Sequence, residues 1–391
     1  MPWREVSVMD QRREFVRLAM QEGVNRRELC RRFGISPDIG YKWLARQRAG
    51  DAELADRSRR PHGSPRRSEA AIEAQVLAVR DAHPAWGARK IAHCLQRDGV
   101  TPPALSTVHE ILRRSGRIVP PPGAPPHAFK RFEKEAPNQL WQMDFKGRMP
   151  MANGAACHPL TVIDDHSRYA LCIGACANEQ SPTVQQQLTA TFRRYGMPDA
   201  FFVDNGSPWG GSGGSPWTGL RVWLLRLGVD VVYARPYHPQ SRGKNERFHR
   251  TLKAEVFAMR RFRDLPELQR AFDAWRTVYN LERPHEALDM EVPATRYRPS
   301  PRAMPDKPAD VEYDNGEITR RVSTTKAYVN FKGRPWRVPY AFRGERLAIR
   351  PKANDGHYGI FFGSRLVATI DLTANKSVSD VSEQASAMSP D

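Results

Sequence analysis

The sequence has few cysteines and no long apolar run. Its five cysteines are Cys30, Cys94, Cys157, Cys172 and Cys176. An odd number without a framework spacing indicates a reducing compartment, and no CxxC pairs with an HxxxH motif, which argues against a zinc site. No segment approaches the roughly 18 apolar residues of a membrane span, and the N-terminus lacks an apolar signal core. We therefore expect a cytoplasmic protein without a membrane partner.

Acidic residues are scarce relative to basic ones. The chain has 61 Lys and Arg against 43 Asp and Glu, a formal net charge of +18 and a pI of about 10. Residues 1–137 carry 26 basic and 16 acidic side chains, so more than half of the excess lies in roughly a third of the chain. This surplus predicts a polyanionic partner, nucleic acid before membrane. A solvated basic surface is the alternative.

Residues 1–50 are predicted to form a helix-turn-helix domain of three short helices. Asn25 with Glu28 forms a capping box, and Ser36-Pro37 is a strong helix start. A three-helix bundle that does not bind DNA is the alternative, but exposed cations on the last helix favour DNA. Side chains expected to face inward are Phe15, Leu18, Ala19, Leu29, Phe33, Ile39, Trp43 and Leu44. The cations expected on DNA are Lys42, Arg46 and Arg48.

A second helix-turn-helix domain is predicted over residues 68–117, after a polar linker at 51–67. Ser68 and Ser106 are the expected caps of its first and last helices. Two tandem domains could read a longer DNA site than one. A Pro-rich, charged linker follows at 118–137. The cations expected to face DNA are Arg113, Arg114 and Arg117.

Residues 138–300 change to a mixed α/β pattern. "QLWQMDFKG" reads as a strand, "PLTVIDDHSRYALCIGACA" as a hairpin, and "DAFFVDNG" and "DVVYARPYHP" as short strands separated by amphipathic helices. This order predicts one layered α/β domain. From 310 to 373, short strands with Gly turns predict a small β-barrel. The Ser- and Ala-rich stretch 374–391 is expected to be disordered.

Three acids stand out in the α/β region. Asp144 lies inside the first strand, Asp204 ends "AFFVD", and Glu246 lies in the first turns of a basic helix. Divalent-metal chemistry on phosphodiesters needs carboxylates held at one point by a rigid backbone. A salt bridge or a turn cap is the alternative for each acid taken singly. The neighbouring cations expected to contact the DNA backbone are Arg242, Lys244, Arg247 and Arg250.

Asp164 and Asp165 are the rival acids, and both fall in the predicted hairpin turn. A role in bracing that turn is favoured over catalysis. Trp209 and Trp217 lie in a Gly/Ser/Pro-rich loop at 207–219. We expect this loop to be a flap whose tryptophans stack on flipped or frayed bases, with tolerated extra length as the alternative.

Five stretches resemble, in the same order, bacterial insertion-sequence transposases of the DDE superfamily, whose catalytic core is like that of retroviral integrases. Asp144 in "WQMDF", Asp204 in "VDNG" and Glu246 in "HPQSRGKNERFHRTLK" resemble the Asp-Asp-Glu triad. "VIDDHSRY" and "YNLERPHEAL" also match. The resemblance covers roughly 137–300. The tandem helix-turn-helix domains and the C-terminal β-domain fit less specifically.

The resemblance implies a ribonuclease-H-like core and two Mg²⁺ (or Mn²⁺) ions per active site, held by Asp144, Asp204 and Glu246. It implies a bacterial, DNA-associated transposase that binds terminal inverted repeats, hydrolyses phosphodiesters at the element ends and joins the 3′-hydroxyl to target DNA. Pairing of ends implies a homodimer or higher multimer on double-stranded DNA, and Lys253 is implied to contact the element's terminal DNA.

Two features depart from the family pattern. The 42 positions from Asp204 to Glu246 exceed the spacing of many members, and the zinc-binding His/Cys domain of retroviral integrases is missing. Two other classes of function remain open: a non-catalytic helix-turn-helix regulator, and a ribonuclease-H-like nuclease that cuts without joining. Strand-transfer products separate the nuclease from a transposase, and a regulator would bind DNA without nicking it.

Overall fold

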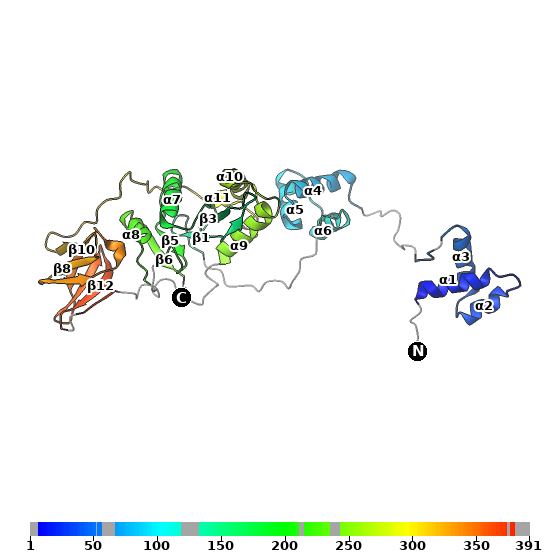
Figure 1. Cartoon of the computed structure of the whole chain (residues 1–391). Coiled ribbons are helices and arrows are strands. Elements are labelled where there is room, and N and C mark those ends of the chain that lie inside the picture. Colours follow the sequence, from blue (N-terminus) through cyan, green and yellow to red (C-terminus); the bar gives the residue numbers. More distant parts are fainter. Residues whose placement is uncertain are drawn as a thin grey trace, which may run out of the picture. The chain divides into compact units, whose positions relative to one another are not determined.

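The computed structural model describes residues 7–51, 53–56, 67–118, 133–210, 215–234 and 243–373, together with the backbone of 376–379. The chain divides into two compact units, Met1–Arg67 and Ser68–Asp391. Figure 1 labels their helices and some of their strands. Across the described part of the chain, no helix combines the length and apolar character needed to cross a membrane.

The first unit contains three helices, as predicted: α1 (Val8–Ala19), α2 (Arg26–Arg32) and α3 (Pro37–Arg48). The two predicted caps are confirmed. The Asn25 side chain accepts from the Glu28 backbone N–H at 3.2 Å, and Ser36 Oγ accepts from the Ile39 N–H at 3.3 Å. Each bond satisfies a backbone donor that the first helical turn leaves without a partner.

One inward-facing residue was placed wrongly in α3. Trp43 and Leu44 are buried as expected, but Ile39 is 44% exposed and the next residue, Gly40, takes the inward position. A Cβ atom at Gly40 would lie 2.5 Å from Cys30 Sγ and 2.9 Å from Phe15 Cζ. The missing side chain therefore lets α3 approach α1 and α2 closely, which a hydrophobic pattern alone does not reveal.

The second helical domain consists of α4 (Ala70–Ala82), α5 (Ala88–Arg97) and α6 (Leu105–Arg114). Its expected serine caps are wrong. Glu69 and Ala104 precede α4 and α6 without a side-chain cap bond, so Ser68 lies outside α4 and Ser106 inside α6. The apolar interior is as the helical spacing predicts, and its buried members include Val76, Ile91, Leu95, Val108, Ile111 and Leu112.

A mixed sheet forms the centre of the α/β domain. Its strands are β1 (Trp141–Phe145), β2 (Met149–Pro150), β3 (Ala156–Asp164), β4 (Ala170–Cys176), β5 (Ala200–Val203) and β6 (Asp230–Tyr233). β3 pairs antiparallel with β1 on one side and β4 on the other. β1 then pairs parallel with β5, and β5 with β6. The parallel part brings the carboxyl ends of β1 and β5 to one edge.

Helices cover both faces of this sheet. One apolar cluster joins Trp141 and Phe201 to α7 (Ser181–Tyr195) and α8 (Gly219–Arg226). The other joins the opposite side of β3 and β4, through Ile163 and Ile173, to α9 (Gly243–Leu252), the π-helix η3 (Lys253–Phe257) and α10 (Leu265–Leu281). Two short helices, η4 (Glu286–Leu288) and α11 (Pro293–Arg296), follow α10 along the chain. The predicted α/β layering is therefore confirmed.

The C-terminal β-domain is not the predicted barrel. Its strands are β7 (Ile318–Arg321), β8 (Tyr328–Phe331), β9 (Arg334–Arg337), β10 (Arg346–Pro351), β11 (His357–Phe362), β12 (Arg365–Asp371) and β13 (Lys376–Ser379), with η5 (Tyr340–Phe342) between β9 and β10. They form an open sheet, β13-β12-β11-β10-β7, and a separate β8–β9 hairpin. No pairing between the described residues closes the sheet, because β7 and β13 form its two edges.

The predicted disorder of 374–391 is wrong for four residues. β13 pairs antiparallel with β12, with Ala368 opposite Ser379 and Asp371 opposite Lys376. The polar composition of the segment did not indicate a strand. An edge strand can form through backbone hydrogen bonds to its one neighbour, without apolar side chains. The prediction for residues 374–375 and 380–391 lies outside the described residues.

Candidate active site

Asp144 and Asp204 lie at the same edge of the sheet. The parallel register pairs Trp141 with Phe201 and Gln142 with Phe202. Continued for two residues, this register places Asp144 opposite Asp204, directly after the last residue of β5. Both side chains are half-buried, and one Asp204 oxygen accepts from the Gly206 N–H at 2.8 Å. The backbone positions of these two acids, from different parts of the chain, thus lie opposite each other at the ends of neighbouring strands.

Glu246 approaches this edge through its helix. His249, one turn later on α9, places Nδ1 4.0 Å from the nearer carboxylate oxygen of Asp144. Thr161, the cross-strand partner of Asp144, donates to the Asp144 carbonyl at 3.0 Å and contacts His249 Nε2 at 2.8 Å. Glu246 lies three residues before His249 on α9, and its side chain is exposed.

His249 is neutral in this arrangement. Burial, supported by the nearby Lys146 charge, lowers its pKa to about 3. The Thr161 hydroxyl already donates to the Asp144 carbonyl, so the proton of the neutral ring belongs on Nε2, where it can donate to Thr161 Oγ1. The imidazole therefore packs α9 against β1 without adding positive charge beside the carboxylates.

The three carboxylates do not form a closed group here. Among the described residues, no three His, Cys, Asp or Glu side chains come together as a set able to hold a metal ion. Residues 235–242, which lead into α9 and include Arg242, lie outside the described residues. The donor chemistry still fits a hard divalent cation. Two carboxylates share the edge of the sheet, a third lies on the adjacent helix, and the neighbouring imidazole is uncharged.

The rival acids have structural roles. Asp164 is fully buried and accepts from the Asn138 N–H at 2.8 Å, the Ser167 N–H at 2.7 Å and the Ser167 hydroxyl at 2.6 Å. Burial raises the pKa of Asp164, although these hydrogen bonds oppose the rise. Asp165 is also fully buried and binds a backbone N–H, an amide and a lysine. The bonds of Asp164 brace the hairpin turn, as the sequence predicted.

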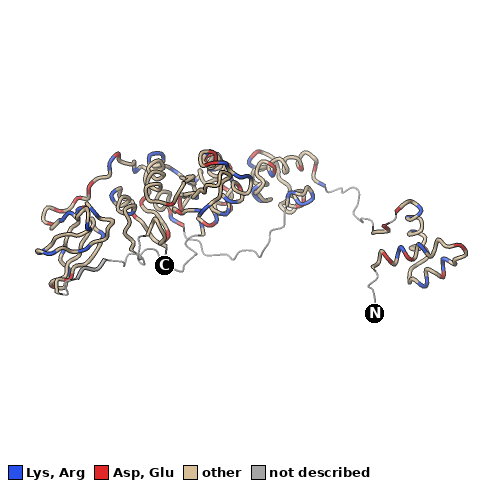
Figure 2. Tube along the Cα trace, viewed as in Figure 1, with Lys and Arg blue, Asp and Glu red and all other residues tan. Residues whose placement is uncertain are grey.

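Figure 2 marks Lys and Arg in blue along the chain. Eight of the predicted DNA-contacting cations are exposed: Lys42, Arg48, Arg113, Arg114, Arg117, Arg247, Arg250 and Lys253. Three of these are also ion-paired within their own domain: Arg113 with Glu110, Arg114 with Glu73 and Arg117 with Asp81. Arg46 is less exposed and pairs with Asp51. Arg46 also donates to the Ala55 carbonyl at 2.7 Å and lies over the Trp43 ring. With a side chain only 11% exposed, Arg46 stabilises its domain and presents little surface to DNA.

Lys244 differs most from its expected role. Its ammonium lies 2.6 Å from Asp165 Oδ1 and 3.1 Å from the Asp165 carbonyl oxygen, and its side chain is 14% exposed. Burial lowers the pKa of Lys244 to about 8, against the opposing attraction of Asp165. The charge of this lysine is therefore paired with that of Asp165 inside the protein.

The expectation that Trp209 and Trp217 stack on bases is wrong. Each is only 4% exposed. Trp209 stacks on Phe145 at a centroid separation of 5.8 Å, and Trp217 packs edge-on against Phe342 of the C-terminal domain at 4.9 Å. The sequence could not show this burial, because it depends on partners distant in the chain. Of the 207–219 loop, residues 211–214 lie outside the described residues.

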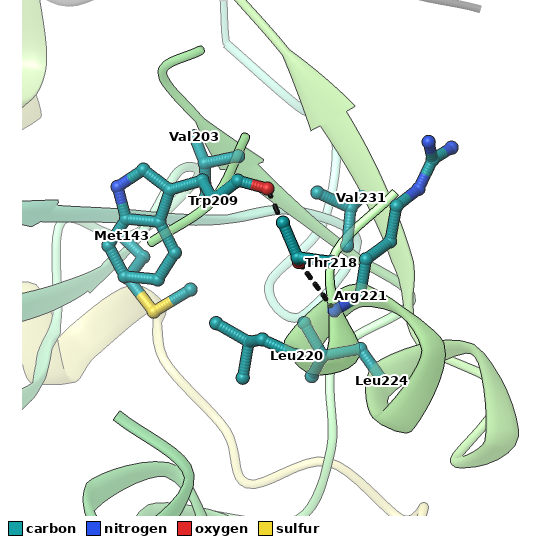
Figure 3. A pocket seen from close by; sticks show the side chains of 8 residues that line it. All are labelled: Met143, Val203, Trp209, Thr218, Leu220, Arg221, Leu224 and Val231. Atoms are coloured by element: carbon teal, nitrogen blue, oxygen red, sulfur yellow. Dashed lines mark hydrogen bonds between the residues drawn. The ribbon is translucent and has the colours of Figure 1, made fainter. Parts of the chain in front are cut away.

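Trp209 also lines a small apolar pocket behind the two aspartates (Figure 3). Met143 and Val203, which immediately precede Asp144 and Asp204, form its wall together with Leu220, Leu224 and Val231. Figure 3 shows Thr218 beside the pocket, bonded to the Trp209 carbonyl at 3.4 Å and to the Arg221 N–H at 3.1 Å. The loop therefore packs under the strand ends that carry the acids.

Five family matches cover most of the chain. A helix-turn-helix domain matches residues 11–62 and a homeodomain-like domain matches 39–112. The integrase core domain matches 134–239, and a second integrase core domain matches 227–293. The C-terminal domain of IS481-family transposases matches 317–378. The acids at the sheet edge and the helix bearing Glu246 lie within the two integrase core matches.

Similarity to solved structures is weak. A chain of the simian T-cell lymphotropic virus intasome in complex with PP2A regulatory subunit B56 gamma aligns over 74% of this chain and 97% of its own, at 17% identity and a TM-score of 0.36. The HTLV-2 integrase catalytic core domain in complex with magnesium aligns over 42% and 99%, at 14% identity and a TM-score of 0.33. At these TM-scores the likeness supports no conclusion about this chain.

Two similar proteins are encoded by bacterial insertion elements. The 31.7 kDa protein of IS407 from Burkholderia multivorans is 28% identical over 174 residues, which are 44% of this chain and 60% of that protein. The 39.2 kDa protein of IS476 from Xanthomonas euvesicatoria is 27% identical over 167 residues, 42% of this chain and 46% of that protein. The matches thus span about half the length of these relatives. Together with the matches to the integrase core domain and to the IS481-family transposase C-terminal domain, they make this chain similar to bacterial insertion-sequence transposases with an integrase-like core.

Proposed function

We propose that this protein binds the terminal inverted repeats of an insertion sequence, hydrolyses phosphodiesters at the element ends and joins the resulting 3′-hydroxyl to target DNA. The observation that supports the proposal is the parallel pairing of β1 with β5, whose carboxyl ends carry Asp144 and Asp204, together with the 4.0 Å approach of His249 on α9, the helix that bears Glu246, to Asp144. The helix-turn-helix matches support DNA binding. The relatives from insertion elements support transposition over other uses of an integrase-like core.

Asp144, Asp204 and Glu246 are the proposed ligands of Mg²⁺ or Mn²⁺, two ions per site. Bound there, divalent ions would activate the attacking oxygen and stabilise the leaving one. The strands hold the two aspartates in place, His249 packs α9 against them without competing charge, and the burial of Trp209 supports the strand ends. No side chain needs to bond covalently to DNA, because water and then the 3′-hydroxyl are the nucleophiles.

Exposed cations are proposed to hold the DNA backbone. Arg247, Arg250 and Lys253 are exposed on α9 and at the start of η3, close in sequence to Glu246. Lys42 and Arg48 are exposed on α3 of the first domain. Phosphate contacts of this kind give binding that weakens steeply with salt. Two element ends must be brought together, so we propose a dimer or higher multimer on DNA.

The test uses the full-length protein, labelled duplexes carrying candidate element ends, and Mg²⁺ or Mn²⁺. We expect the wild type to nick the ends and form joined products, and Glu246→Gln to bind the same DNA without cutting. Nicking without joined products would indicate a nuclease. Binding without nicking by both proteins, on ends verified in vivo, would favour a DNA-binding regulator. Equal cutting by Glu246→Gln would remove Glu246 from the site.

A further inference from the structure

Asp165 joins three separate segments of the chain. Its Oδ2 accepts from the Lys134 N–H at 2.8 Å, and its Oδ1 accepts from Gln142 Nε2 at 2.7 Å and from Lys244 Nζ at 2.6 Å. Its own N–H donates to the Leu140 carbonyl at 2.9 Å. Asp165 is fully buried, so these bonds form where water competes little.

Two of these partners stand next to the proposed ligands. Gln142 precedes Asp144 by two residues on β1, and Lys244 precedes Glu246 by two residues on α9. One carboxylate therefore connects the strand that carries the first acid with the helix that carries the third. On the other side of Glu246, His249 attaches α9 to Thr161 of β3 at 2.8 Å. The helix is held at two points, with Glu246 between them.

We propose that Lys244 and Asp165 form a positioning pair that sets Glu246 against the sheet edge, and that Lys244 does not bind DNA. This inference rests on the proposed metal-dependent function. It gives Lys244 an indirect role in metal binding, whereas the basic residues around it in the sequence would suggest a role in DNA binding. The pair acts only through the backbone of α9.

The environment of the pair supports a positioning role. A charge-assisted bond to a buried partner fixes a lysine more firmly than a surface contact does. Removing either partner leaves the other without its main counterion in a buried site, and that loss is not recovered from solvent. Arg168 and Glu133 form a second ion pair at the same turn, and Arg168 also donates to the Asp165 carbonyl. The turn is thus a rigid base for α9.

The direction in which Lys244→Met changes the affinity for Mn²⁺ distinguishes a positioning role from a purely electrostatic one. Lys244→Met removes a positive charge near the proposed ligands, so a purely electrostatic effect would tighten Mn²⁺ binding. Loss of positioning would weaken it instead, by about tenfold or more, the range found when residues that orient metal ligands are replaced. Mn²⁺ binding to the full-length protein, measured without DNA by calorimetry or paramagnetic resonance, distinguishes the two. Unchanged or tighter binding by Lys244→Met would overturn the proposal.

Salt dependence of DNA binding separates positioning from phosphate contact. With the labelled end duplex, Lys253→Met is the matched control on the same helical segment, where Lys253 is exposed. Removing one phosphate contact lowers the slope of log K against log salt by about 0.9. We expect this loss for Lys253→Met and none for Lys244→Met. A slope reduced by Lys244→Met with unchanged Mn²⁺ affinity would show that Lys244 is a phosphate ligand.

Two further variants guard against a simple folding defect. Lys244→Arg keeps the charge and should retain Mn²⁺ affinity within about threefold of the wild type, a change smaller than loss of the pair produces. Asp165→Asn combined with Lys244→Met should be no weaker than the more affected single variant, since both remove one interaction. Additive losses would contradict a shared pair. Wild-type protein that binds Mn²⁺ and DNA yet never cuts would count against the proposed function and leave the pair to be judged by these binding measurements.

Discussion

Replacing Trp209 with alanine should destabilise the integrase-like core and leave the affinity for frayed-end DNA unchanged. The indole is 4% exposed and stacks on Phe145, next to Asp144. A buried tryptophan removes about 200 Å² from water, which at about 25 cal/mol per Å² corresponds to about 5 kcal/mol. Large-to-alanine changes at such sites cost about 3–5 kcal/mol. We expect a loss of this size in the free energy of unfolding.

Urea denaturation followed by circular dichroism measures this loss, and Trp209→Phe is the matched control. Phenylalanine keeps an aromatic ring against Phe145, so it should lose less than half as much stability as alanine. Affinity for a frayed-end duplex provides the second measurement. If Trp209→Ala unfolds at the wild-type urea concentration while its affinity for frayed ends falls, the tryptophan stacks on bases and its assignment to the core is wrong.

Three other predictions concern separate parts of the chain. Arg46→Ala should lower the melting temperature of the first domain, whereas Lys42→Ala should lower only DNA affinity and its salt slope, by about 0.9; the reverse pattern would restore Arg46 as a DNA contact. Gly40→Ala should destabilise that domain by about 1–3 kcal/mol in thermal unfolding, because its methyl group would overlap Cys30 Sγ. Burial lowers the pKa of His285 to about 3. Its contribution to stability is therefore complete above about pH 6.5 and declines as the pH falls toward 3, and His285→Gln should flatten that part of a stability-against-pH curve.

Helix caps were predictable where the capping residue and the backbone N–H that it binds lie close in the sequence. The Asn25 and Ser36 caps bond to residues three positions away, and both are confirmed. The apolar spacing of the helices and strands also gave the layered core. Ser68 and Ser106 failed because a serine near a helix start is only one of several ways to begin a helix.

The sequence did not predict the surroundings of side chains whose partners lie far away in the chain. The family resemblance predicted the three acids from their motifs. The partner of Lys244, by contrast, lies 79 positions away, so the sequence around Lys244 was interpreted as a DNA-binding surface. Trp209 and Trp217 likewise resembled exposed residues of a Gly-rich loop until their distant partners, Phe145 and Phe342, were known. Strand pairing that leaves a sheet open is also a tertiary property, which explains the incorrect prediction of a barrel.

The packing of Trp217 shows that the α/β domain and the C-terminal β-domain, although separated near residue 300 in the sequence, share one apolar cluster. Trp217 and Val222 belong to the apolar cluster of the C-terminal sheet, although the chain reaches that sheet only a hundred residues later. Arg226 bonds to Asp310 at 2.9 Å, and Arg365 pairs with Asp230. A chain cut after residue 300 would leave this apolar surface of α8 uncovered and prone to aggregate. Exchange of C-terminal domains between related proteins should therefore succeed only when the matching α8 surface is transferred with them.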